Sequence, residues 1–113
     1  MSQTVQTPSG TILEEIELGG YGAFPDQLYV ISVGEDLYAC NNATLPDGQN
    51  ADGLATFPDP DEATTYMGLL AGLSGEIKPV KFEDARAIVK RKPRLSCLFL
   101  FLGGRIVEVH YVK

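Results

Sequence analysis

The C-terminal end of the chain holds the feature that most restricts the fold. Residues 95–102 (LSCLFLFL) are apolar at nearly every position, which predicts a central β-strand covered on both faces. Gly103-Gly104 then forms a two-residue connection of the kind that closes a β-hairpin. Residues 105–112 (RIVEVHYV) alternate, with Val107, Val109 and Tyr111 on one face and Glu108 and His110 on the other, as expected for the returning strand. A strand covered on both faces needs a packed layer on each side.

A helix start is the second clear signal. Asp59 precedes Pro60, and Glu62 comes three residues after Asp59. An Asp at the N-cap accepts hydrogen bonds from the first-turn amides, Pro suits the first helical position, and Glu62 can bond back to the cap residue. On this helix Gly68 and Gly72, four residues apart, would let a neighbouring backbone approach closely. The apolar residues that follow the start recur at the three- and four-residue spacing of a buried helix face: Ala63, Tyr66, Met67, Leu70 and Leu73.

The rest of the chain reads as short elements joined by turns. Residues 41–53 are rich in Asn, Asp, Gly and Pro, and we expect a long surface loop there. This loop lacks the alternating oxygen donors of a calcium loop. The other expected elements are strands at 28–33, 37–40 and 54–57, an edge strand at 76–81 that contains Pro79, and a second helix at 82–92.

This order of elements predicts an α+β fold. We expect a largely antiparallel sheet with two helices packed on it and a C-terminal β-hairpin. Residues 1–10 have the polar, turn-rich composition of a disordered tail, and residues 11–113 then form a single domain. A chain of 113 residues can build a core without disulfides or a metal.

Several function classes lack their sequence signatures. No apolar run approaches the roughly 20 residues of a membrane span, and the N-terminus does not resemble a secretory signal. We therefore expect a cytoplasmic protein that does not bind membranes. Two distant cysteines and one histidine do not form a metal site, and no motif indicates a cofactor.

Catalytic residues are also not evident. Glu108 and His110 share a strand face and could form a general base, but a solvated outer face is the interpretation we favour, because no nucleophile accompanies them. Cys97 lies among Leu and Phe residues and should be buried and inert, whereas Cys40 could be exposed. The sequence thus predicts a protein that is not an enzyme.

Charge is strongly segregated along the chain. Residues 1–77 contain twelve acidic residues and no basic one, whereas residues 78–113 contain nine basic and three acidic residues. The simplest interpretation is that the two halves neutralise each other within one domain. The alternative is a charged binding surface, and its sharpest candidate is the basic cluster Lys90, Arg91, Lys92 and Arg94.

This cluster suggests a binding partner. Cations at a helix C-terminus are favoured by the helix dipole even without a partner. As a binding surface, the cluster would suit an acidic protein surface, either on another protein or on a second copy of this chain. Nucleic acid is the alternative, but the net charge of −6 and the absence of interleaved aromatic residues count against it. We therefore expect a non-catalytic protein–protein interaction or regulatory domain.

The order LYVIS, GLATFPDPDEATTYMGLL, IKPVKFEDARAIVKR and LFLFLGGRIVEV, over about residues 28–112, resembles the N-terminal domain of SseB-type proteins. Residues 57–70 also resemble a small family of uncharacterised cyanobacterial and plastid proteins. The resemblance implies a non-catalytic interaction or secretion-associated domain. It implies no catalytic residue in this chain.

Overall fold

The C-terminal hairpin forms as the sequence predicts. Strand β6 (Cys97–Leu102) and strand β7 (Arg105–Tyr111) pair antiparallel. Gly103 and Gly104 join them with φ angles of 59° and 77°, a left-handed backbone that glycine adopts without steric cost. The computed structural model describes residues 24–45, 48–70 and 74–113, so the tail expected at residues 1–10 lies outside the described residues.

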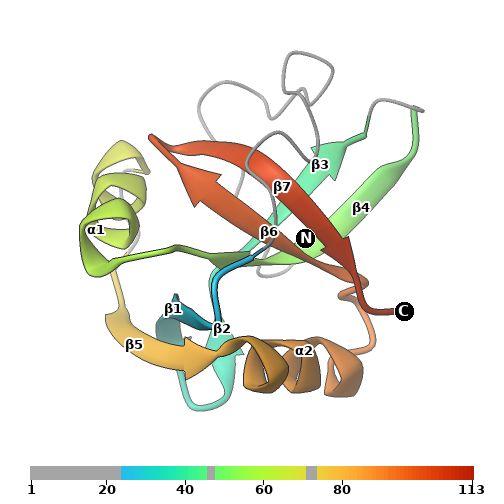
Figure 1. Ribbon diagram of the computed structural model, residues 1–113, viewed down its shortest axis with the longest axis horizontal. Helices are drawn as coiled ribbons and strands as arrows, with labels where there is room; N and C mark the ends of the chain where they lie inside the picture. Colours follow the sequence, from blue (N-terminus) through green and yellow to red (C-terminus); the bar gives the residue numbers. More distant parts are fainter. Residues whose placement is uncertain (1–23, 46–47, 71–73) are drawn as a thin grey trace.

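A four-stranded sheet is built around β6, in the order β3-β4-β6-β7 (Figure 1). Strands β3 (Cys40–Thr44) and β4 (Asn50–Thr56) pair antiparallel, whereas β4 and β6 run parallel. A β-bulge interrupts the β6–β7 register after Leu100. The extra residue disturbs the alternation of β7, so Val107 and Val109, expected on one face, pack against different core clusters.

The prediction of a surface loop at residues 41–53 is wrong, because most of this segment forms β3 and the start of β4. Its polar side chains pair across the two strands. Asn42 Nδ2 donates to Asp52 Oδ1 at 2.9 Å, and Thr44 Oγ1 donates to Asn50 Oδ1 at 3.2 Å. These cross-strand partners allow residues of low β propensity to form a strand pair.

A second, three-stranded sheet has the order β2-β1-β5, with all pairs antiparallel. It contains β1 (Gln27–Gly34), β2 (Leu37–Tyr38) and β5 (Glu76–Lys81). The edge position expected for β5 is confirmed, and Pro79 therefore removes no hydrogen bond from the interior of the sheet. Tyr29 and Phe57 exchange two backbone hydrogen bonds, of 2.9 and 3.0 Å, which tie this sheet to the first one.

The two helices cover opposite faces of the four-stranded sheet. Helix α1 (Pro60–Leu69) packs against the face that carries Phe99 and Phe101, and α2 (Phe82–Arg91) packs against the face that carries Leu98 and Leu100. All four of these β6 side chains are fully buried. The prediction of a central strand covered on both sides is therefore confirmed.

These elements confirm the α+β fold, with two helices, mostly antiparallel pairing and a C-terminal hairpin. The strands form two sheets. Strand β2 ends at Tyr38 in the three-stranded sheet, and β3 begins at Cys40 in the four-stranded sheet. Within the part of the chain that the structure describes, no helix is both long and apolar enough to span a bilayer.

Candidate functional site

The basic cluster lies where α2 ends and the chain turns towards β6. Lys92 precedes Pro93 and has extended backbone angles (φ −104°, ψ 110°), as a residue before proline prefers. Its amide still donates to the carbonyl of Val89 at 3.1 Å, and the amide of Leu95 donates to the carbonyl of Lys92 at 3.1 Å. The helix end therefore presents Lys90, Arg91, Lys92 and Arg94 within one tight change of direction.

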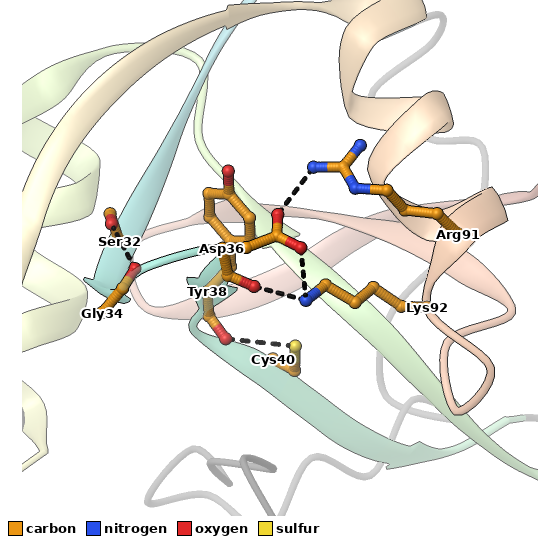
Figure 2. Close-up of polar contacts among 7 residues, drawn as sticks. All are labelled: Ser32, Gly34, Asp36, Tyr38, Cys40, Arg91 and Lys92. Carbon is orange, nitrogen blue, oxygen red and sulfur yellow. Dashed lines mark hydrogen bonds and ion pairs between the residues drawn. The ribbon is translucent and has the colours of Figure 1, made fainter.

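Two of these cations bind a single carboxylate from the other half of the chain. Arg91 Nη2 donates to Asp36 Oδ1 at 2.7 Å, and Lys92 Nζ lies 3.1 Å from Asp36 Oδ2 (Figure 2). Lys92 Nζ also donates to the backbone carbonyl oxygen of Asp36. The hydrogen bonds from Arg91 and then from Lys92 hold the pKa of Asp36 below its ordinary value, and Asp36 in turn raises the pKa of Arg91.

Asp36 is presented by a turn of unusual backbone geometry. It is the second residue of the two-residue connection between β1 and β2, and its φ of 54° is left-handed. Asp is one of the few residues besides glycine that tolerate this conformation. The turn places the carboxylate over the end of α2, 55 residues away in sequence from Arg91.

A fifth cation joins the cluster from the C-terminal end of the chain. Lys113 Nζ donates to the carbonyl oxygen of Lys92 at 2.8 Å. Figure 1 accordingly shows the C-terminal end close to the connection between α2 and β6. We call the set Lys90, Arg91, Lys92, Arg94 and Lys113 the basic end. Lys90 and Arg94 are exposed, and neither forms an ion pair with any described acidic residue.

The structure thus brings the four predicted residues together at the surface but assigns them different environments. Lys92 is half-buried, and both Arg91 and Lys92 are engaged by Asp36. Sequence reasoning missed Asp36 and Lys113 as members of this region. The only sequence signal for Asp36 was the segregation of charge, whose simplest interpretation is that acids of the first half lie near bases of the second.

The Glu108–His110 face, expected to be solvated, is half-buried. His110 packs edge-on against Phe82 and Phe24, with ring centroids 5.0 and 6.0 Å away. His110 Nε2 and Glu108 Oε1 are buried and make no hydrogen bond to any described residue. A general base needs a positioned partner to receive or supply its proton, and this arrangement provides none within the described chain.

The two cysteines are buried and lie on opposite faces of the four-stranded sheet. Cys40 belongs to the core cluster under α2, and Cys97 to the one under α1. Burial raises the pKa of Cys40 to about 11 and that of Cys97 to about 12. Both thiols are therefore protonated at neutral pH, and the exposure considered for Cys40 is wrong. The described residues contain no group of three or more His, Cys, Asp or Glu side chains placed to hold a metal ion.

Comparisons with known proteins do not extend this description. No protein-family model, no curated protein and no solved structure matches this chain significantly.

Proposed function

We propose that this domain acts without catalysis, by binding an acidic surface of a partner protein through its basic end. The observation that supports this function is an imbalance of charge. Five cations gather around the end of α2, and Asp36 is the one acidic side chain that forms ion pairs with them in the described chain. Positive potential therefore remains at the surface around Lys90 and Arg94, and it would attract an acidic partner.

Part of this charge has a purely structural use. Cations in the last turn of a helix compensate the negative end of the dipole, and Lys113 also satisfies the carbonyl of Lys92. Lys90, which also lies in that last turn, and Arg94 make no direct bond there, because their side chains reach no described acid or carbonyl, and their charge stays open to solvent. They are therefore the residues to change in a test, and the ion pairs of Asp36 remain intact when they are removed.

The test is binding of a dye-labelled oligoglutamate peptide, followed by fluorescence anisotropy at low salt. The variant Lys90→Gln/Arg94→Gln should bind at least several-fold more weakly than the wild type. The matched control is Lys78→Gln/Lys81→Gln, which removes two exposed cations from β5. Lys81 lies at the opposite end of α2, about 15 Å from the basic end for a helix of this length. Circular dichroism verifies that both variants fold.

Three outcomes would decide against the proposal. Equal loss of binding in both double variants would mean that net charge alone is responsible. Binding that persists well above 0.15 M salt would not fit a screened surface interaction, because the Debye length is then below about 8 Å. Preference for a labelled oligonucleotide over the peptide would make nucleic acid the ligand. Sedimentation of the free protein tests the remaining case, in which the acidic surface belongs to a second copy.

A further inference from the structure

We propose that Arg91 and Lys92 form a carboxylate-binding clamp that Asp36 occupies in the free protein, and that an acidic side chain of the partner replaces Asp36 on binding. This inference rests on the proposed function. It names the group that the basic end receives and the internal group that competes for the same atoms.

The geometry is that of a site for a carboxylate. Arg91 and Lys92 each contact a different oxygen of the same carboxyl group, at 2.7 and 3.1 Å. Figure 2 shows the two side chains converging on Asp36 from the end of α2. Two donors directed at the two oxygens of one group recognise Asp or Glu, whichever chain supplies it.

The contact is also easily displaced. The side chains of Arg91 and Asp36 are each 49% exposed, so an incoming carboxylate can reach the same guanidinium from solvent. Ion pairs this exposed contribute little to stability, because water screens the attraction and the long side chains lose conformational freedom. Lys92 would still bind the backbone carbonyl of Asp36 after the exchange, which keeps the β1–β2 turn in position.

The surroundings favour an occupant with several acidic residues. Lys90 and Arg94 flank the clamp without acidic partners among the described residues. A single carboxylate from the turn leaves them uncompensated, whereas an acidic segment could fill the clamp with one side chain and contact the flanking cations with its neighbours. The class of ligand is therefore a protein segment with closely spaced Asp or Glu residues.

Glu35 provides a matched control for this competition. It is exposed, adjacent to Asp36 in the same turn, and forms no ion pair or hydrogen bond with the basic end. The substitutions Asp36→Asn and Glu35→Gln each remove one negative charge at nearly the same place. Only the first replaces the charged occupant of the clamp by a neutral, more weakly held one, and Asn also tolerates the left-handed backbone of residue 36.

The experiment measures the affinity of the labelled oligoglutamate peptide for the full chain by anisotropy. Asp36→Asn should tighten binding by about two- to fivefold, the range expected when a weak exposed ion pair no longer competes. Glu35→Gln should change it by clearly less. In the background Arg91→Gln/Lys92→Gln, which weakens binding, Asp36→Asn should have no further effect, because the two changes act through one contact.

Several results would overturn the inference. Equal tightening by Asp36→Asn and Glu35→Gln would show an effect of charge alone. If the wild type binds through Lys90 and Arg94 but Asp36→Asn does not bind more tightly, the proposed function stands and the clamp is wrong. If neither the wild type nor Asp36→Asn binds, both proposals fail. A preference of Asp36→Asn for the oligonucleotide would replace the protein ligand by nucleic acid.

A second measurement does not depend on any variant. Carboxyl ¹³C titration of the wild type should report a lowered pKa for Asp36 in the free protein. At pH 7, where the peptide is ionised, saturating oligoglutamate should shift the Asp36 carboxyl ¹³C resonance, because this carboxylate leaves Arg91 and Lys92. An Asp36 resonance that stays unchanged in the complex would mean that Asp36 has not left the clamp, and would overturn the inference.

Discussion

The amide nitrogen of Gly103 donates a hydrogen bond of 2.7 Å to Oε1 of Glu62. This contact joins the first turn of α1 to the turn of the C-terminal hairpin, across 41 residues of sequence. The sequence suggested instead that Glu62 would bond back to the residue that caps its own helix. The Glu62 carboxylate therefore links two elements that local pattern treats as independent.

Removal of this link should destabilise the fold modestly. We expect Glu62→Ala to lower the free energy of unfolding by about 0.5–1.5 kcal/mol, since the Gly103 amide can still be solvated. Glu62→Gln keeps an oxygen acceptor and should lose clearly less. Equilibrium urea denaturation measures both variants, and equal losses would show that the bond to Gly103 contributes nothing.

The N-cap of α1 makes a separate prediction. Asp59 Oδ1 accepts from the amide of Glu62 at 2.9 Å, which satisfies one of the unpaired first-turn amides. Asp59→Ala should cost about 0.5–2 kcal/mol of unfolding free energy, and Asp59→Asn, which is also a good cap, much less. Unfolding curves of Asp59→Ala that coincide with the wild type would contradict the importance of this cap.

Two glycines should respond oppositely to the same added methyl group. At Gly53 a Cβ would lie 2.6 Å from the buried ring of Phe99, so we expect Gly53→Ala to cost about 1–3 kcal/mol by overpacking. At Gly68, in α1, a Cβ meets no atom within 4 Å. Gly68→Ala should therefore stabilise the protein, by up to about 1 kcal/mol from helix propensity. The close approach that the sequence suggested at Gly68 is thus wrong, and Gly72 lies outside the described residues.

Thermal or urea unfolding of the two glycine variants tests this contrast directly. The result that would contradict it is a Gly53→Ala protein as stable as Gly68→Ala. That outcome would mean that Phe99 can move aside without cost in a core where its side chain is fully buried.

The buried thiols predict how stability depends on pH. Folding raises the pKa of Cys40 to about 11 and that of Cys97 to about 12, from an ordinary value of 9.0. The folded protein therefore holds these protons more tightly than the unfolded chain does. Stability should be unaffected by the thiols well below pH 9 and should fall as the pH rises from 9 towards 11.

The contribution of the two thiols to the pH dependence of stability can be isolated with the double variant Cys40→Ala/Cys97→Ala. Between pH 9 and pH 10 the wild type should lose stability faster than this variant, with each thiol approaching about 1.4 kcal/mol per pH unit. A thiol-reactive disulfide reagent offers an independent measurement. It should label neither cysteine in the native protein at pH 8 and both in denaturant, whereas rapid native labelling would contradict their burial.

The sequence alone determined the elements whose signals are local. Residues 97–102 are apolar at every position, which favours a strand covered on both faces, and this is where β6 lies. The start of α1 was predictable for a similar reason. Asp59 and Pro60 satisfy the needs of a helix N-terminus within three residues, so no distant contact was required to recognise it.

Tertiary structure decided the features that depend on partners far apart in sequence. Asn42 and Asp52 read as loop residues until each supplies the other's hydrogen bond across β3 and β4. The basic cluster read as four equivalent cations until the β1–β2 turn brought Asp36 to Arg91 and Lys92. The role of a polar or charged side chain depends on the group that it contacts. The tertiary fold decides which group that is, because sequence spacing determines the periodicity of one element but not the position of one element against another.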